Sequence, residues 1–291
     1  MATAALPAHY VSVAAVTHPG LVREKNEDAF VVADLTRGLR LVDDAHARFE
    51  VGERGVLLAV SDGMGGAWAG DVASALVVDT VTREIADAPP VTPRDAVLSA
   101  AVHAAHEAVR KRGERDHATM GATLTAVLVR GGRAYVAEVG DSRAYLVRGA
   151  EIAQLTHDQS LAQLLVDSGV LDPRDARHSP LRSVILQAMG HQPDLAVALG
   201  RFELRDRDRL VLCSDGLTTH VTDEEIRDIV LSSRRPDNAA HALVALANAR
   251  GGTDNITVVV ADLGGALAPP APGERPEGAV EVISTYEPKV G

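Results

Sequence analysis

The sequence predicts an α+β fold in which antiparallel sheets are covered by helices. Strand patterns arrive in adjacent, hairpin-like runs, and the helix patterns between them come in pairs. This order differs from the regular strand–helix alternation that is typical of parallel sheets. Apolar residues make up 46% of the 291 residues and aromatic residues only 3%. We therefore expect a sizeable core built from Ala, Val and Leu.

The strands are predicted from short apolar or alternating runs. Two runs in the middle of the chain are joined by Arg130-Gly131-Gly132, which is a hairpin signal. Residues 36–55 are polar and charged, and we expect a loop or an excursion there. The predicted strands are 10–18, 29–35, 57–62, 122–129, 133–140, 142–149, 197–204, 209–215 and 255–263.

Two helices carry clear start signals. Thr92-Pro93-Arg94-Asp95 predicts a helix start, with Thr92 as the cap and Pro93 at the first position. Thr222, followed three residues later by Glu225, is a capping-box pattern. The predicted helices are 69–87, about 92–112, 222–231 and 237–249, and 158–190 is helical and polar with breaks at Pro173 and Pro180.

Composition excludes several classes of protein. The formal charge of −11 argues against nucleic acid or an anionic membrane as the main partner and suits a protein that binds cations. The single cysteine excludes an internal disulfide and a Cys-rich metal site. No apolar run reaches the length of a transmembrane helix, and the first ten residues do not read as a signal peptide. We expect a cytoplasmic monomer.

The chain divides into three parts by composition. Residues 1–9 are expected to form an N-terminal tail, and residues 10–263 a single catalytic domain that includes the segment 158–190. Residues 264–291 are rich in proline and glycine, which predicts a disordered or loosely docked tail. A short strand at 280–285 is the alternative for part of that tail.

Two apolar runs lead directly into Ser-Asp-Gly, at residues 57–63 and 210–216. A buried strand that ends in this way delivers a carboxylate to a sheet edge, where we expect the glycine to let the backbone turn. Two such strands could direct Asp62 and Asp215 to one point. Converging carboxylates suit magnesium or manganese, which prefer oxygen ligands. Because Asp-Gly is a common turn pair, two ordinary strand-to-turn junctions are the alternative.

Further acidic residues stand at predicted strand edges. Glu27 and Asp28 precede the strand 29–35, and Asp254 precedes the strand 255–263. In antiparallel neighbours the end of one strand lies beside the start of the next, so these acids can share an edge with Asp62 and Asp215. The pattern is a candidate metal site, although each residue alone would be assigned to a solvated turn.

Other chemistries have weaker support. Gly63-Met64-Gly65-Gly66 indicates close approach of the backbone to a ligand, but it matches neither nucleotide-binding glycine pattern. Cys213 lacks the arginine six residues on that a cysteine phosphatase needs, and it is expected to be a small core residue. Arg23 could offer a bidentate guanidinium to an anion.

Six motifs, in order, resemble the protein phosphatase 2C family of metal-dependent serine/threonine protein phosphatases, in its bacterial form. The resemblance spans roughly residues 10–263 and implies a four-layer α-β-β-α sandwich of two antiparallel sheets flanked by helix pairs. The motifs are REKNEDAF (23–30), AVSDGMGG (59–66), MGATLTAVLV (120–129), VGDSRAYLVR (139–148), LCSDGL (212–217) and GTDNITVVV (252–260).

The resemblance implies a role for each candidate residue. Asp62 would bridge two Mn²⁺ or Mg²⁺ ions, the Gly63 carbonyl would bind one ion, and Asp215 and Asp254 would hold the other. Arg23 would bind the substrate phosphate. The remaining implied positions are Glu27 and Asp28 in the metal shell, directly or through waters, and Asp116 as a ligand of a weaker third metal. Asp141 in VGDSR is expected to be structural.

The resemblance also implies the reaction and its setting. A bridging metal-bound hydroxide would attack phosphoserine or phosphothreonine in proteins, in opposition to a bacterial serine/threonine kinase. Segment 158–190 matches the flap beside the active site, a candidate for substrate selection. Met64 stands where animal members carry a histidine and cannot donate a proton. The alternatives are a pseudophosphatase or regulatory binding module on the same fold, and a phosphatase that acts on one regulatory partner.

Overall fold

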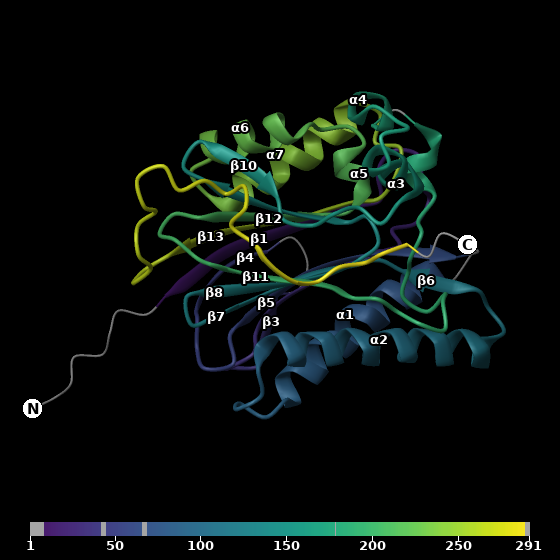
Figure 1. The fold of residues 1–291 in the computed structure, drawn as a ribbon, viewed down its shortest axis with the longest axis horizontal. Coiled ribbons are helices and arrows are strands. Elements are labelled where there is room, and N and C mark those ends of the chain that lie inside the picture. The colour runs from purple at the N-terminus through teal and green to yellow at the C-terminus, as the bar shows by residue number, and fades with distance from the viewer. Residues whose placement is uncertain (1–8, 42–44, 66–68, 178, 289–291) are drawn as a thin grey trace, which may run out of the picture.

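The computed structural model describes residues 9–41, 45–65, 69–177 and 179–288, which form a sandwich of two antiparallel sheets (Figure 1). The strands are β1 (Tyr10–His18), β2 (Asp28–Asp34), β3 (Leu39–Leu41), β4 (His46–Glu50), β5 (Val56–Gly65), β6 (Met120–Ala122), β7 (Leu124–Arg130), β8 (Arg133–Val139), β9 (Arg143–Arg148), β10 (Glu151–Gln154), β11 (Ala198–Glu203), β12 (Arg209–Cys213), β13 (Ile256–Gly264) and β14 (Glu281–Ser284). The helices are α1 (Gly70–Asp87), α2 (Arg94–Asp116), α3 (Leu161–Asp167), α4 (Pro173–Ala176), the 3₁₀ helix η1 (Pro180–Ser183), α5 (Asp215–Thr218), α6 (Asp223–Ser232) and α7 (Pro236–Ala249).

Helices cover the outer face of each sheet. One sheet has six strands in the order β10-β9-β12-β13-β1-β4. The other has eight, in the order β14-β11-β8-β7-β5-β2-β3, with β6 paired to β5. Helices α1 and α2 pack on the eight-stranded sheet, and α5, α6 and α7 pack on the six-stranded sheet (Figure 1). The predicted α+β sandwich is therefore confirmed.

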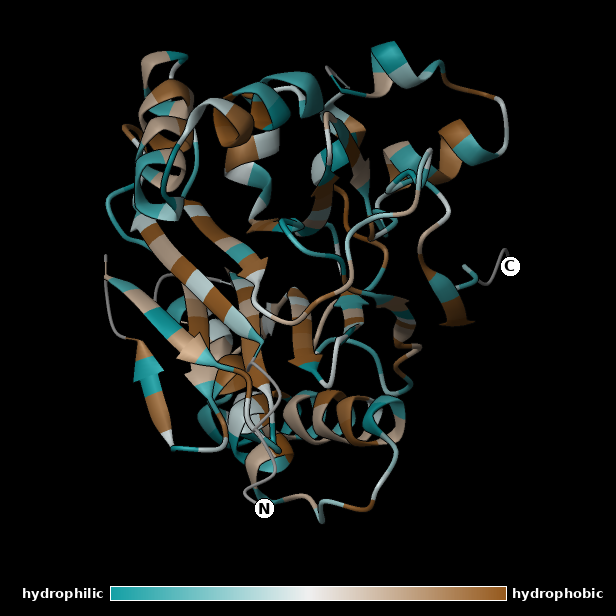
Figure 2. Ribbon diagram, turned by 90° about the vertical axis from the view of Figure 1, so that its left-hand side faces the viewer, coloured by the Kyte–Doolittle hydropathy of each residue, from teal (hydrophilic) through white to brown (hydrophobic). Residues whose placement is uncertain are grey.

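The core consists of three apolar layers, one between the sheets and one under each set of helices. Successive residues of β5 alternate between two of them, as side chains on a strand must. Leu57 and Ala59 face α1 and α2, whereas Leu58 and Val60 face the other sheet. Both faces of β5 are covered, and this explains the unbroken apolar run before the first Ser-Asp-Gly. Figure 2 shows the same apolar colouring along the central strands.

Local signals in the sequence had mixed outcomes. The capping box of α6 is confirmed, since Glu225 donates its N–H to Thr222 Oγ1 at 3.2 Å and accepts from the Thr222 N–H at 3.0 Å. The start of α2 was predicted wrongly. That helix begins at Arg94, with Pro93 at the N-cap and no side-chain cap, and it extends to Asp116 before His117 in the left-handed region ends it.

Residues 36–55 contain two short strands, in place of a simple loop. β3 pairs with β2 in the eight-stranded sheet, and β4 pairs with β1 in the six-stranded sheet. The charged side chains hid these strands because an edge strand is solvated on one side and reads as polar.

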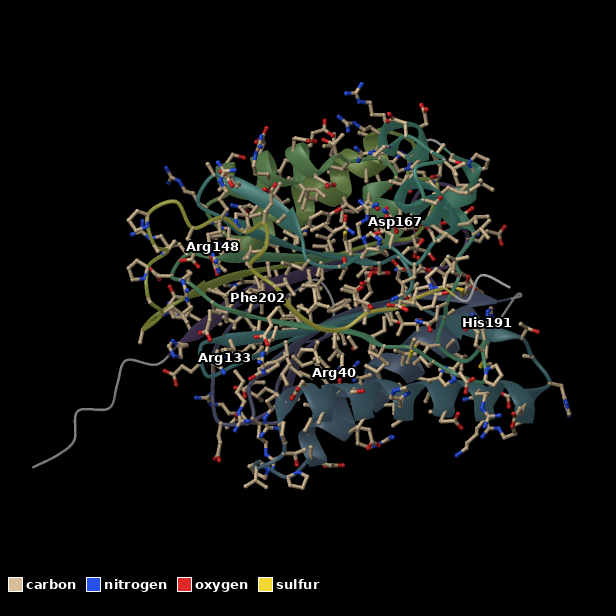
Figure 3. All side chains as sticks on the ribbon, in the orientation of Figure 1. Arg40, Arg133, Arg148, Asp167, His191 and Phe202 are labelled. Atoms are coloured by element: carbon tan, nitrogen blue, oxygen red, sulfur yellow. The ribbon has the colours of Figure 1, made fainter. Side chains whose placement is uncertain are left out.

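The C-terminal segment is docked, and the expectation of a disordered or loosely docked tail is corrected. β14 adds a strand beside β11, as the alternative for residues 280–285 predicted. Leu267 lies in the layer between the sheets, and Glu274 forms an ion pair with Arg148 at 2.8 Å. The Arg148 side chain is only 2% exposed (Figure 3), and it is already paired with the buried Asp208 at 2.7 Å, so the tail adds a second carboxylate to an existing buried ion pair. No helix among the described residues is long and apolar enough to cross a bilayer.

Candidate functional site

Each sheet brings two acidic residues to the same end of the sandwich. Asp28 opens β2 and lies directly opposite Asp62 of β5 in the antiparallel register. In the other sheet Asp215 follows β12 and Asp254 precedes β13, and these two strands are antiparallel neighbours. The sequence predicted that acids before some strands and after others share one edge. The strand register places them in this way.

Hydrogen bonds tie the two acidic pairs together across the sandwich. Asp28 belongs to the eight-stranded sheet, yet its Oδ2 accepts from Ser214 Oγ and from Thr257 Oγ1, both at 2.7 Å. Both hydroxyls come from the six-stranded sheet. Ser214 directly precedes Asp215, so the hydrogen bond from Ser214 to Asp28 fixes the position of Asp215 relative to Asp28.

The carboxyl groups are half-buried at this edge, and they raise one another's pKa. Burial raises the pKa of Asp62 well above its usual range, and the charges of Asp28 and Asp215 raise it further. Burial also raises the pKa of Asp28 to about 7, although the Ser214 and Thr257 hydrogen bonds oppose that rise. For Asp215, burial and the charge of Asp254 raise the pKa to about 6. Groups that repel each other in this way favour a bound positive charge.

The donor atoms suit divalent cations. Asp28 and Asp215 each keep one buried carboxylate oxygen, Oδ1, without a hydrogen-bond partner among the described residues. Buried polar atoms normally have partners, and carboxylate oxygens are the ligands that Mg²⁺ and Mn²⁺ prefer. The acids gather at one edge, but no three Asp, Glu, His or Cys side chains in the described part of the chain form a ready-made metal-binding group.

Glycine is required in both Ser-Asp-Gly copies because backbone atoms approach it closely. A Cβ at Gly63 would lie 2.1 Å from the Gly70 carbonyl oxygen and 2.5 Å from that of Glu27. A Cβ at Gly216 would lie 1.9 Å from the Asn255 carbonyl oxygen. Neither glycine has a positive φ, so the predicted reason, a free turn of the backbone, is wrong. Gly66 lies outside the described residues.

Glu27 and Arg23 lie on the loop that leads into β2. The Glu27 carboxylate packs against Gly70, where a Cβ would come within 3.0 Å of its oxygens, at the start of α1. Arg23 forms a 2.8 Å ion pair with Asp254, and its side chain is 55% exposed. Asn255 fixes this loop by accepting from the Glu27 N–H at 2.8 Å and donating to the Lys25 carbonyl at 2.7 Å. The sequence reasoning did not identify Asn255, although its place directly after Asp254 was a usable signal.

Two further aspartates, Asp116 and Asp141, differ in their relation to the four aspartates of this edge. Asp116 ends α2 and is paired with Arg112 and Arg115, which lower the pKa of its carboxyl group. No hydrogen bond or ion pair in the described part of the chain joins it to the acidic edge, by which we mean Asp28, Asp62, Asp215 and Asp254. Asp141, expected to be structural, is buried with Oδ1 unpartnered, and its pKa is raised by burial and by the charge of Asp215. Asp141 is therefore electrostatically part of the acidic edge.

Cys213 is a core residue, as predicted. It is fully buried in the layer between the six-stranded sheet and its helices, and burial raises the pKa of its thiol. A thiol that stays protonated and inaccessible cannot act as a nucleophile.

Comparison with known proteins matches the site to a family. The family model described as protein phosphatase 2C matches residues 35–247. The serine/threonine protein phosphatase PstP of Mycobacterium tuberculosis is 40% identical over 253 residues, which is 86% of this chain and 44% of that protein. The serine/threonine phosphatase stp of Listeria welshimeri is 35% identical over 231 residues, 76% of this chain and 89% of that protein.

Solved structures agree with these matches. The catalytic domain of PstP in complex with two manganese ions has a TM-score of 0.73 and 37% identity, and the match covers 88% of this chain and 99% of that one. The chain spans less than half the length of the full mycobacterial relative, but nearly the whole of the shorter one. By sequence and by fold, the chain belongs to the protein phosphatase 2C family.

Proposed function

We propose that this chain is a metal-dependent phosphatase that hydrolyses phosphoserine and phosphothreonine in proteins. The observation that carries the proposal is the meeting of Asp28 and Asp62 from one sheet with Asp215 and Asp254 from the other at a single half-buried edge. Family relatives that are named serine/threonine protein phosphatases support the substrate class.

The acidic edge would hold two divalent cations, Mn²⁺ or Mg²⁺. The pKa of Asp62 is raised by burial and by the charges of acids from both sheets, Asp28 and Asp215, which suits a ligand shared by both ions. Asp28, Asp215, Asp254, Glu27 and the Gly63 carbonyl would complete their coordination. Such ions, when bound, supply an activated water and neutralise the charge that develops on the phosphoryl oxygens. The manganese-bound relative supports this choice of metal.

Arg23 would bind the substrate phosphate. Its guanidinium is more than half exposed and already stands beside Asp254, so it reaches both solvent and the acidic edge. A planar guanidinium can hold two phosphate oxygens at once, and it would exchange its carboxylate partner for them. No residue of the chain needs to form a phosphoenzyme, which agrees with the burial of Cys213.

The proposed physiological role is to oppose a serine/threonine kinase by removing phosphate from the kinase or from its substrates. The alternative is a pseudophosphatase that binds partners on this fold without hydrolysis. The unpartnered Oδ1 atoms of Asp28 and Asp215 favour the enzyme, because a pure binding module gains nothing from buried carboxylates that repel each other.

Assays with purified protein test the proposal. We expect hydrolysis of p-nitrophenyl phosphate and of a phosphothreonine peptide with Mn²⁺, loss of both activities in EDTA, and recovery when Mn²⁺ is returned. A phosphotyrosine peptide of the same sequence serves as the control and should react more slowly. Full activity in EDTA would overturn the metal assignment. Inactivity with every divalent ion, despite metal binding by calorimetry, would favour the pseudophosphatase.

A further inference from the structure

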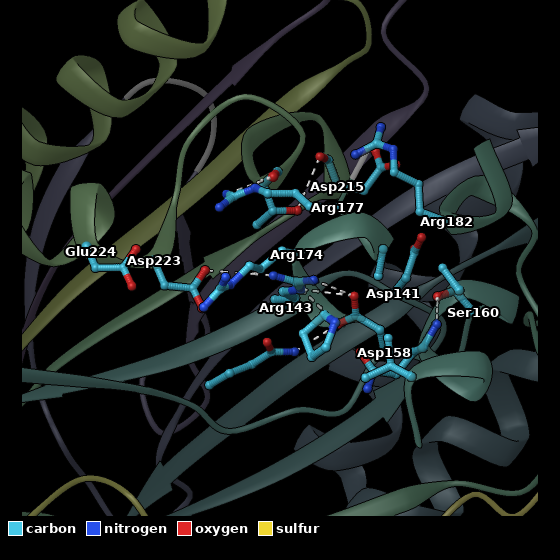
Figure 4. A pocket seen from close by; sticks show the side chains of 17 residues that line it. Asp141, Arg143, Asp158, Ser160, Arg174, Arg177, Arg182, Asp215, Asp223 and Glu224 are labelled. Atoms are coloured by element: carbon cyan, nitrogen blue, oxygen red, sulfur yellow. Dashed lines mark hydrogen bonds and ion pairs between the residues drawn. The ribbon is translucent and has the colours of Figure 1, made fainter. Parts of the chain in front are cut away.

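A cavity of about 700 Å³ lies beside the acidic edge. One end is lined by Asp141 and Asp215 of that edge. One part of the lining comes from the flap segment, which includes α3, α4 and η1, and another part from the start of α6 (Figure 4). The space is large enough for side chains of a bound peptide, and it opens next to the place where the phosphate would be held.

Arginine side chains are concentrated on the flap wall of this cavity. Four arginines line the cavity (Figure 4), and one of them, Arg143, is neutralised by Asp158 at 2.7 Å. The other three belong to the flap segment, and none has an ion pair with a carboxylate of the described residues. They are Arg174, Arg177 and Arg182. Five carboxylates also line the cavity, so the arginines are a local group on the flap wall and not an excess over the whole lining. The carboxylates are those of Asp141, Asp158, Asp215, Asp223 and Glu224.

Arg177 holds the flap wall in place. Its guanidinium donates to the carbonyl oxygens of Thr218 at 3.3 Å and Val221 at 2.6 Å. Thr218 ends α5, the helix that Asp215 begins, so the bonds link the flap to the element that carries a site carboxylate. Both acceptors are uncharged carbonyl groups. The charge of Arg177 also reaches Glu224, whose pKa is lowered by hydrogen bonds at the start of α6 and further by Arg177.

Arg174 and Arg182 extend that charge along the wall. The side chain of Arg174 has no hydrogen bond or ion pair within the described ranges, and the residue is exposed. Arg182 is half-buried and close enough to Asp215 to oppose the rise in pKa that burial and Asp254 produce there. Arg182 therefore lies near the acidic edge, and Arg174 lies in the exposed part of the flap. The lining also includes the carboxylates of Asp223 and Glu224 at the start of α6.

We propose that this cavity is a substrate subsite for an anionic side chain near the phosphorylated residue, either a carboxylate or a second phosphate. Arg174 is the residue that contacts this anion, and Arg177 is a positioning residue that keeps the flap wall against α5. The inference rests on the proposed phosphatase function and names the substrates that the same site prefers: phosphothreonine segments with acidic or multiply phosphorylated flanks.

A scanning set of phosphothreonine peptides tests this subsite. Each of the three positions on either side of the phosphothreonine carries Asp, phosphoserine, Ala or Lys in turn, and kcat/KM is measured with Mn²⁺. At one or more positions we expect Asp and phosphoserine to exceed Ala by about two- to fivefold, the range of an exposed ion pair, through a lower KM. The Asp and phosphoserine arms separate the two sources of negative charge.

The variant Arg174→Gln should bring the ratio of acidic to alanine peptide close to one. Arg83→Gln, an exposed arginine of α1 that pairs only with its neighbour Glu84, is the matched control and should keep the wild-type ratio. Arg177→Ala should also reduce the ratio, and Arg177→Lys should restore part of it because a positive donor remains. A purely structural role for Arg177 would lower all peptides equally.

Three results would overturn the inference: equal kcat/KM for all peptides, a preference for Lys over Asp, or an unchanged ratio in Arg174→Gln. A preference for Lys would assign the subsite to the Asp223 and Glu224 wall. Hydrolysis of p-nitrophenyl phosphate separates this failure from failure of the proposed function. If the enzyme hydrolyses every substrate without preference, only the subsite proposal is wrong. If the protein is inactive on all substrates, the proposed phosphatase function is wrong as well.

Discussion

The two Ser-Asp-Gly copies have the same sequence and different backbones. In the first copy the strand continues through Ser61, Asp62 and Gly63, since β5 ends only at Gly65. In the second copy the strand ends at Cys213 and a helix begins at Asp215. The tripeptide therefore does not determine the local structure at either place.

The neighbours of each copy explain the difference. Asp62 is held extended on both sides by Thr123, which accepts from its N–H at 2.9 Å and donates to its carbonyl at 2.8 Å. At the second copy the Asp215 carbonyl accepts from the Thr219 N–H at 2.8 Å, which is a helical bond. A strand partner therefore sets the backbone of Asp62, and a helical turn sets the backbone of Asp215. Both aspartates reach the same edge by these different routes.

The largest expected effect comes from the two carboxylates. Asp62→Asn should reduce Mn²⁺-dependent kcat/KM by at least about a thousandfold, since a metal clamp supplies several kcal/mol. Asp215→Asn should cost less, because Asp62 interacts with more of the other acids. Kinetics at saturating Mn²⁺, with metal content measured in parallel, compare the two variants. An equal loss would remove the proposed difference between the copies.

The same two variants should stabilise the metal-free protein at pH 8. A carboxyl group whose pKa is higher in the folded state than in the unfolded state lowers the stability of the fold once the pH exceeds its unfolded-state pKa. The loss is complete when the pH exceeds its folded-state pKa. Removing the charge removes that loss, and 1 kcal/mol corresponds to about 2 to 4 °C for a chain of this size. Asp62→Asn should raise the melting temperature more than Asp215→Asn, since the pKa of Asp215 is about 6. A lower melting temperature for Asp62→Asn in EDTA would contradict this account.

The two glycines should be next in effect. Gly63→Ala places a methyl group against the Gly70 and Glu27 carbonyl oxygens, and Gly216→Ala places one against the Asn255 carbonyl. Each should cost about 1 to 3 kcal/mol, as overpacking does, measured by urea unfolding in EDTA.

The control for the glycines separates crowding from dihedral strain. Gly149 has a φ of +63° and open space around it, so Gly149→Ala tests the dihedral cost alone. We expect that cost to be about 1 kcal/mol. If Gly63→Ala is milder than Gly149→Ala, close backbone approach is not what requires glycine in the first copy.

The smallest expected effect distinguishes the two serines. Ser214→Ala removes a hydrogen bond that holds down the pKa of Asp28, now about 7, so that pKa should rise. Because a cation needs the ionised carboxylate, the pH midpoint of Mn²⁺ binding should rise by about one unit. Ser61→Ala removes a bond to the Thr123 carbonyl and should leave the midpoint unchanged. Calorimetric titrations between pH 5 and 9 measure both, and equal midpoints would contradict the role of Ser214.

Periodicity and capping predicted much of the fold. The hairpin at Gly131 and Gly132 has positive φ at both residues, as its sequence required, and the Thr222 capping box forms. The cap of α2 was predicted at Thr92, but Pro93 takes the N-cap position. A pattern in the sequence predicts a contact well when the contact joins residues a few positions apart, as in the capping box. The exact end of a helix also depends on contacts with the rest of the protein, which a few residues do not reveal.

Long-range placement was less accessible. Asp141 was assigned to a turn because the motif around it reads as one, whereas burial beside Asp215 makes it part of the acidic edge. Asp116 was assigned by family order, and its role as a ligand of a third metal stays a prediction; its ion pairs with Arg112 and Arg115 could not be inferred from that order. The docked tail was missed because Glu274 serves Arg148, which lies far away in the sequence.

The sequence by itself determined most of the strands, the order of the motifs and the acids that stand at strand edges. These follow from alternation, apolar runs and residue chemistry, which are properties of neighbouring residues. Only the tertiary structure decided that Asp28 lies opposite Asp62, that Ser214 crosses the sandwich to bind Asp28, and that the flap arginines line one cavity. Register and packing decide such contacts, because they join residues whose distance in the chain carries no information about their distance in space.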